Sequence, residues 1–267
     1  MTDSYNQRNI NLQGQQAVST LIFDSNASSQ SDIVFTDWNA LLAKARETPG
    51  IVDITVGPGT STVPAGTYDL TGIRLKGLSA FATLDITDAV FQNMLYVESL
   101  ILATGISSAN SVSSLQYGAG AADLVTIIDS NFLTGVNATV PLVDITGGVT
   151  IGWAVRGSGF FSNNPGVPCI AIDGTSTLGA TTLSGVGGNA WGGNQGDDAF
   201  VSVAAGGTFN LGLGTGDVFW SADQTGTVTV ARFDDYESAV LANWNGVEPL
   251  NVKNALDRIA AAVGPIA

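Results

Sequence analysis

Acidic side chains are the residues in this chain whose type and spacing could best carry catalysis. The sequence holds 23 Asp and Glu against nine Lys and Arg, with one Cys and no His. A glycosidase needs two carboxyl groups on opposite sides of the scissile bond, so neighbouring aspartates are the natural candidates. The candidates are the pair Asp197 and Asp198, together with Asp173, Asp217, Asp223, Asp234 and Asp235. The chemistry they could support is cleavage of a polysaccharide.

The same aspartates also have a simpler interpretation. An Asp in a turn hydrogen-bonds to nearby backbone and keeps the surface soluble. A lyase would further need Arg or Lys beside its substrate, and none lies between Arg156 and Arg232. Arg74 and Lys76 remain, and a solvated strand face accounts for both. The pattern therefore favours turn stabilisation over catalysis, and we expect no enzymatic activity.

Other kinds of site lack their residues. Without His, and with Cys169 as the single Cys, the chain cannot form a Cys/His zinc site or a Ser-His-Asp or Cys-His catalytic centre. The Gly57–Thr60 turn lacks the Lys of a phosphate-binding loop. The Gly-rich stretch Gly192–Asp197 only approaches a calcium-binding repeat, so calcium at an acidic corner stays an open alternative. The sequence predicts no cofactor and no metal, and an apolar neighbourhood predicts that Cys169 is a small buried hydrophobe.

Charge and hydropathy limit the partners. A net charge of −14 argues against nucleic acid, whose phosphates are bound by Lys and Arg. The most apolar stretch, Leu95–Ile106, is interrupted by Glu98 and is too short to span a bilayer. Met1–Gln16 contains no apolar run typical of a signal peptide. We therefore expect no membrane insertion, and synthesis in a host cytoplasm.

The pattern divides the chain into three parts. Residues 1–31 are rich in Asn, Gln and Ser and predict an extended arm with one strand at 18–23. Residues 32–236 predict the main body, which begins with an amphipathic helix over 36–47, N-capped by Thr36 and apolar at 38, 41, 42 and 45. Residues 237–267 predict a turn followed by a short C-terminal helix.

Between the two helices, short β-branched runs alternate with Gly, Asn, Ser, Thr and Asp clusters, which is typical of an all-β fold. Aligned runs end at Ile145, Ile172, Val203 and Val230, in nearly equal steps along the chain. An aromatic residue follows at a similar distance after each of the first three: Phe161, Trp191 and Trp220. These repeats predict a parallel β-solenoid, in which coils of about three strands stack over one core. Tyr117, Trp153 and Trp191 are expected in that core rather than stacked on sugars.

The predicted C-terminal helix has a narrow apolar face at 252, 255, 256, 259, 260 and 263. That face either folds back on the last coil or packs against copies of itself. If copies pack together there, the oligomerisation residues are Val252, Leu256, Ile259 and Val263.

Two stretches resemble known families. Phe35–Ala45 followed by Thr62–Tyr68 resembles the beginning of pectin-lyase-like right-handed parallel β-helices, where a capping helix precedes a φ-P-x-G-x-Y coil. Glu248–Ile259 resembles the P-x-x-V-x-x-A-L-D-R-φ ends of bacteriophage tail and head fibre proteins. Together they imply a non-enzymatic virion protein, such as a tail or head fibre, spike or capsid decoration protein. Phage β-helices are commonly homotrimers, so the resemblance also implies self-association, with other virion proteins bound through the N-terminal arm.

A second hypothesis belongs to another functional class. The chain could be a carbohydrate-binding or carbohydrate-degrading β-helix that acts on host surface polysaccharide, with Asp197 and Asp198 in a groove between coils. The missing His and the scarce cations favour the structural virion protein, which would contribute to particle assembly, stability or host attachment.

Overall fold

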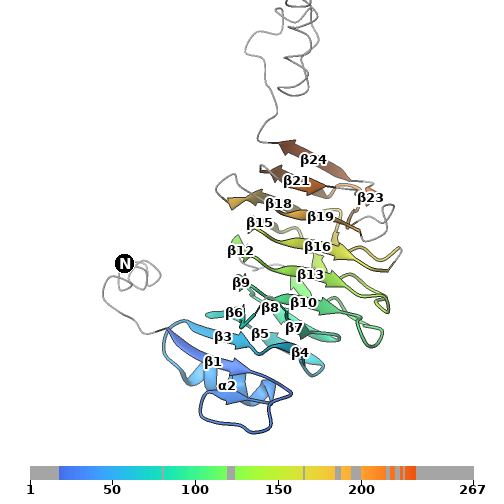
Figure 1. Cartoon of the computed structure of the whole chain (residues 1–267). Coiled ribbons are helices and arrows are strands. Elements are labelled where there is room, and N and C mark those ends of the chain that lie inside the picture. The colour runs from blue at the N-terminus through green and yellow to red at the C-terminus, as the bar shows by residue number, and fades with distance from the viewer. Residues whose placement is uncertain are drawn as a thin grey trace, which may run out of the picture.

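In the computed structural model of this chain, the described residues form three parallel β-sheets and one α-helix (Figure 1). The structure describes residues 18–79, 81–118, 124–164, 166–183, 188–193, 200–214, 217–219, 223–224 and 226–232. The all-β class predicted from the sequence is confirmed.

Most strands that neighbour one another within a sheet are not neighbours in the chain. In spatial order, sheet A has ten strands: β2 (Val34–Phe35), β1 (Ser19–Phe23), β3 (Val52–Val56), β6 (Ile73–Gly77), β9 (Tyr96–Glu98), β12 (Leu124–Ile128), β15 (Thr150–Arg156), β18 (Thr177–Thr182), β21 (Thr208–Leu213) and β24 (Thr227–Arg232). Sheet B has seven: β22 (Val218–Phe219), β19 (Ala190–Gly193), β16 (Gly159–Ser162), β13 (Asn131–Thr134), β10 (Ile101–Thr104), β7 (Ala82–Asp85) and β4 (Gly59–Thr62). Sheet C also has seven: β23 (Asp223–Gln224), β20 (Val201–Val203), β17 (Ile170–Ile172), β14 (Val143–Ile145), β11 (Leu115–Tyr117), β8 (Ala89–Gln92) and β5 (Gly66–Asp69).

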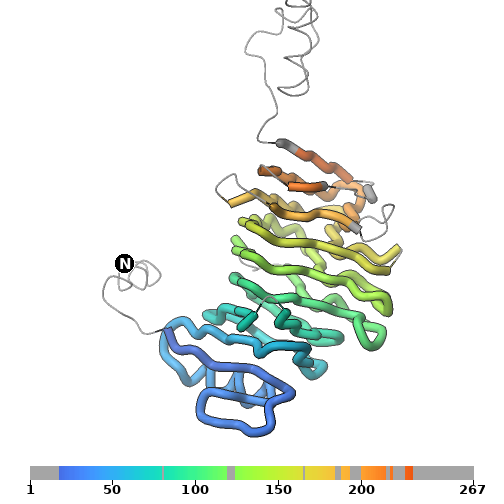
Figure 2. The backbone as a smooth tube through the Cα atoms, viewed as in Figure 1, coloured from blue at the N-terminus to red at the C-terminus, as the bar shows by residue number. Residues whose placement is uncertain are grey.

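The strand order shows how the chain is wound. From β3 onwards every sheet takes each third strand, so the chain visits sheets A, B and C in turn before it returns to sheet A. Each strand pairs in parallel with its equivalent in the next coil, as in the pairing of Val143–Ile145 with Ile170–Ile172. Figure 2 shows the resulting stack of coils. This arrangement is consistent with the predicted parallel β-solenoid.

Side chains in register fill the space inside the coils. One row of sheet A runs through Leu21, Ile54, Leu75, Val97, Ile127 and Val155, each at most 4% exposed. In sheet B, the rings of Phe132, Phe160 and Trp191 follow one another at 5.1 and 4.3 Å between centroids. The core is therefore continuous along the stack, because alternate residues of every strand point inward.

The predicted repeat alignment is correct in part. Ile145, Ile172 and Val203 are register partners in sheet C, as expected. Val230 does not belong with them, because β24 lies in sheet A and the partner of Val203 is Gln224. The last described coil is shorter than the preceding ones. Counting the same number of residues onward from Val203 therefore passes β23 and reaches β24.

The predicted aromatic row also needs a correction. Trp191 pairs with Phe160 and not with the expected Phe161, whose partner is Gly192. A shift of one residue moves a side chain to the other face of its strand, and here it is Phe160 that is fully buried. Trp220 lies outside the described residues.

Helix α2 (Trp38–Glu47) is the amphipathic helix expected over 36–47, and it buries Trp38, Leu41, Leu42 and Ala45. Its N-cap is Asp37 rather than Thr36. The Asp37 carboxylate accepts a hydrogen bond from the amide of Ala40 at 2.8 Å. The hydroxyl of Thr36 instead accepts from the Gln30 side chain at 2.6 Å. The strand expected at 18–23 within the arm is β1, which pairs with β3 inside sheet A.

Candidate functional site

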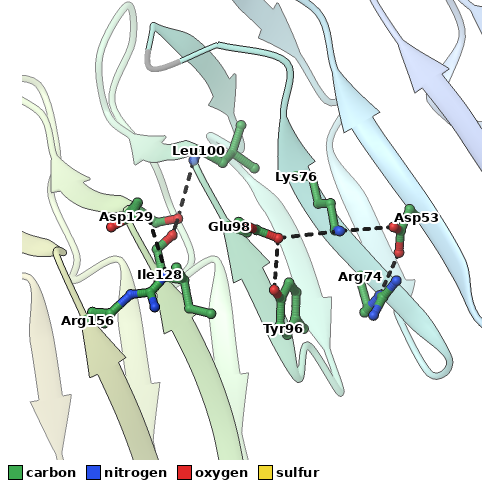
Figure 3. Close-up of polar contacts among 10 residues, drawn as sticks. Asp53, Arg74, Lys76, Tyr96, Glu98, Leu100, Ile128, Asp129 and Arg156 are labelled. Atoms are coloured by element: carbon green, nitrogen blue, oxygen red, sulfur yellow. Dashed lines mark hydrogen bonds and ion pairs between the residues drawn. The ribbon is translucent and has the colours of Figure 1, made fainter. Parts of the chain in front are cut away.

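A cluster of charged residues lies on the outer face of sheet A across β3, β6 and β9 (Figure 3). Asp53 and Arg74 are register partners, and so are Lys76 and Glu98. Their strand neighbours Ile54, Leu75 and Val97 point into the core, so alternation sends the charged side chains outward. Register between coils thus brings together residues that lie far apart in the chain.

The four charged groups and Tyr96 form one connected network, which we call the sheet A charge cluster. Arg74 Nε donates to Asp53 Oδ1 at 2.5 Å. Lys76 Nζ lies 3.1 Å from Asp53 Oδ2 and 3.3 Å from Glu98 Oε2. The Tyr96 hydroxyl donates to Glu98 Oε2 at 2.8 Å, and both cations lie over the Tyr96 ring, 5.4 and 5.8 Å from its centroid.

Partial burial strengthens these contacts, because nearby side chains displace part of the water that would screen them. The Asp53 side chain is 10% exposed, and those of Arg74 and Lys76 are 30% and 28% exposed. The hydrogen bond from Tyr96, followed by that from Lys76, holds the pKa of Glu98 below its ordinary range. Burial, and then the hydrogen bond to Glu98, raises the pKa of Tyr96 to about 12.

The cluster corrects the expectation that Arg74 and Lys76 lie on a solvated face. Both cations are bound to carboxylates of neighbouring coils, and two positive groups balance two negative ones. An anionic substrate would have to displace Asp53 or Glu98 to reach them. The geometry therefore suits the joining of three coils better than the binding of an anionic polysaccharide.

The candidate catalytic pair, Asp197 and Asp198, lies outside the described residues, as do Asp234 and Asp235. The side chain of Asp223 is likewise not described. Two of the predicted acidic residues, Asp173 and Asp217, can be placed, and each is engaged by backbone amides.

Asp217 is 5% exposed and ends a ladder of polar side chains at the corner between sheets A and B. In this ladder, each side chain accepts from an amide of the preceding coil. The amides of Leu100, Ser130, Ser158 and Asn189 donate to Ser130 Oγ, Ser158 Oγ, Asn189 Oδ1 and Asp217 Oδ1, at 3.2, 3.1, 3.0 and 2.8 Å respectively. The other Asp217 oxygen accepts from the amide of Gly214 at 2.8 Å and from the hydroxyl of Thr182. The role of Asp217 is therefore structural.

Asp173 follows β17, and its carboxylate joins two coils through hydrogen bonds. One carboxylate oxygen accepts from the amide and hydroxyl of Thr175, both at 2.9 Å. The other accepts from the amide of Gly147 in the preceding coil at 2.8 Å. The backbone hydrogen bond from Thr175, helped by that from Gly147, lowers the pKa of Asp173 strongly. This is the turn role that the sequence predicted for acidic corners.

Sequence reasoning missed Asp144, an outward-facing residue of β14. Its pKa is raised, first by burial and then by repulsion from the Asp173 carboxylate. A pair of carboxyl groups with pKa values shifted in opposite directions is one pattern found in acid–base active sites, and it also occurs in structural networks. The signal was present in the repeat, since Asp144 stands between the inward residues Val143 and Ile145.

The three aromatic residues predicted in the core and the single thiol lie inside the stack. Tyr117, Trp153 and Trp191 are at most 2% exposed, so their predicted core position is confirmed. Cys169 is fully buried as expected, and burial raises the pKa of its thiol to about 12. Within the described ranges, no three His, Cys, Asp or Glu side chains gather closely enough to hold a metal ion. In the same part of the chain, no helix is long and apolar enough to cross a membrane.

Residues 1–17 of the predicted arm lie outside the described ranges, and so do the four predicted oligomerisation residues, Val252, Leu256, Ile259 and Val263. Comparisons of the chain with family models, with curated proteins and with solved structures gave no match.

Proposed function

We propose that this chain is a right-handed parallel β-helix, closed at its first end by α2, that serves as a non-enzymatic structural protein of a bacteriophage virion. In this proposal it is a fibre, spike or decoration protein that assembles as a homotrimer. Its N-terminal arm binds other virion proteins, and the body projects from the particle and contributes to stability or to contact with a host surface glycan.

The observation that carries the proposal is the way polar side chains are used along the stack. The sheet A charge cluster joins three coils, the ladder from Ser130 to Asp217 joins four more, and Asp173 fastens a further corner. Each of these three groups binds a neighbouring coil, so its polar side chains are engaged within the fold. With the continuous core beneath them, these contacts favour a stiff stack of coils, which suits a mechanical role in a larger assembly.

The pair of Asp144 and Asp173 favours a second candidate, a carbohydrate-degrading β-helix. Asp144 would act as the proton donor, because its raised pKa keeps it protonated at higher pH than an ordinary aspartate. Asp173 would remain ionised beside it. Against this role, both oxygens of Asp173 are already occupied by amides and a hydroxyl of its own corner.

Turnover on polysaccharide separates the two candidates. The purified full chain is incubated with capsular polysaccharides and lipopolysaccharides of candidate hosts, and new reducing ends are measured. The structural proposal predicts none above the level of a heat-denatured sample. Asp88, whose carboxylate accepts from the amide and hydroxyl of Ser111, provides a matched control at another corner. Turnover that is lost in Asp144→Asn but kept in Asp88→Asn would replace the structural proposal with the enzymatic one. If Asp197→Ala alone abolished activity, the site would instead be the one expected from the sequence.

A further inference from the structure

The two ends of the described stack differ in how well their core residues are covered. At the first end, α2 contributes four buried apolar residues, and its Trp38 ring stacks on Phe91 at 5.5 Å between centroids. At the other end, β24 is the last described strand of sheet A. Its inward-facing residues Val228 and Val230 pack against the core but stay only partly buried.

Register shows that Val228 and Val230 are less buried than their equivalents because of their position at the end. Their partners in the preceding coil, Phe209 and Leu211, are at most 1% exposed. The Thr227 amide donates to the Gly207 carbonyl at 2.9 Å, so this residue faces the preceding coil. In a parallel ladder alternate residues face opposite neighbours, which directs the amides of Val228 and Val230 to the open edge. An unpaired edge strand beside a partly exposed end of the core can pair with other chains, so another segment is expected to cover it.

The spacing of the coils indicates which part of the chain reaches this end. From β3 onwards, the crossing from one sheet A strand to the next is shortest between β21 and β24, at residues 214–226. The longest crossings are residues 99–123, between β9 and β12, and residues 183–207, between β18 and β21. Residues 233–249, which separate Arg232 from the apolar helical pattern that begins at Leu250, are intermediate in length. A further crossing of ordinary length would therefore end where that pattern begins in the sequence.

We infer that residues 250–263 of the same chain cover the open end, with Val252, Leu256, Ile259 and Val263 packed over Val228 and Val230. A tethered segment acts at an effective concentration in the millimolar range, which favours it over a second copy of a chain with a charge of −14. This assigns the predicted helix to one of the two roles that its sequence left open. The inference is independent of the proposed virion function, because it concerns how a single chain closes its core.

Two charge-matched double variants of the full chain test this assignment. Leu256→Asp with Ile259→Asp places charges on the apolar face, whereas Asn251→Asp with Asn254→Asp adds the same charge on the other faces. Hydrogen exchange across residues 227–232 is measured by mass spectrometry, together with the solution mass. If residues 250–263 cover this end, exchange across residues 227–232 accelerates at least about tenfold in the first variant and is unchanged in the second.

The other outcomes are decisive as well. Equal exchange in both variants and the wild type would overturn the inference, and so would a drop in solution mass with unchanged exchange, which would place the four residues between copies. If the aspartate variant loses the whole fold, Leu256→Ala with Ile259→Ala replaces it, judged by the same exchange ratio. A monomeric wild type would contradict the proposed homotrimer and leave this inference standing.

Discussion

At the scale of single residues, most of the described acidic groups act on the backbone of their own coil or of a neighbouring one. Asp69 and Asp88 have lowered pKa values because hydrogen bonds stabilise their charged forms, as they do for Asp173. Asp144 differs from these three in having a raised pKa, caused first by burial and then by the neighbouring Asp173 carboxylate. Carboxylates that are stabilised in the fold make stability fall in acid, because protonation removes the hydrogen bonds that they accept.

Tyr96→Phe tests the sheet A charge cluster through two pH windows. The Tyr96 pKa is raised from 10.0 to about 12, so its contribution to stability is present below pH 10 and is lost as the pH rises towards 12. The Glu98 pKa is lowered from 4.5, so its contribution is present above that value and is lost as the pH falls below it. In the Phe variant we expect shallower losses in both windows, measured as the thermal midpoint against pH. Thr126→Val, at the register partner of Tyr96, is the control and should keep the wild-type dependence of the thermal midpoint on pH. If Tyr96→Phe also kept that dependence, the sheet A charge cluster would add no stability.

Gly105→Ala tests a close approach between two corners. Gly105 has a φ of +66°, and a Cβ there would lie 2.5 Å from the Cα of Ala138 and 2.6 Å from its amide nitrogen. Gly166 has a similar φ of +80° but open space around it, so Gly166→Ala measures the backbone strain alone. We expect Gly166→Ala to lower the free energy of unfolding by about 1 kcal/mol and Gly105→Ala by at least twice that amount, in chemical denaturation. Equal losses would mean that the two corners separate easily.

At the scale of elements, the sequence predicted the strands and the helix better than the contacts between coils. Val52–Val56 and the helix follow directly from their apolar spacing. The sheet A charge cluster was missed because register between coils does not follow a constant period. From β3 to β24, the starts of successive sheet A strands are closest between β21 and β24 and furthest apart between β18 and β21, so Asp53, Arg74 and Glu98 could not be aligned by counting. The same irregularity put Val230 in the wrong sheet.

Ser158→Ala tests the polar ladder that fixes this register. Removal of the hydroxyl leaves the buried amide of Ser130 without its acceptor, and it also removes the hydrogen bond from Ser158 to the Arg156 carbonyl. We expect a loss of about 1–3 kcal/mol in the free energy of unfolding, because a buried donor without a partner cannot regain water.

Ser202→Ala is the control for this prediction, since Ser202 lies on an outward-facing position of β20 and is only partly buried. It should change stability by less than about 0.5 kcal/mol. If both variants unfold at the same denaturant concentration, the ladder is not what holds the corner between sheets A and B.

At the scale of the whole molecule, the described chain is one stack of coils with a single continuous core, and its low content of charged residues follows from that form. Charged residues make up 12% of the chain, and most inward positions of the described coils are apolar, with Ser61, Thr104, Thr134 and Ser162 as buried polar exceptions. A helix closes the first end, and the chain's own C-terminal segment is inferred to close the other. Such a stack suits a mechanical role, and the proposed place in a virion rests on the resemblance of Glu248–Ile259 to the ends of phage fibre proteins.

The solution mass of the purified full chain, measured by light scattering after size exclusion, tests the proposed assembly most directly. We predict a mass of about three times the 27.3 kDa of one chain, independent of protein concentration over the measured range. A mass of 27.3 kDa at every concentration would contradict the homotrimer and would favour a monomeric binding or enzymatic module.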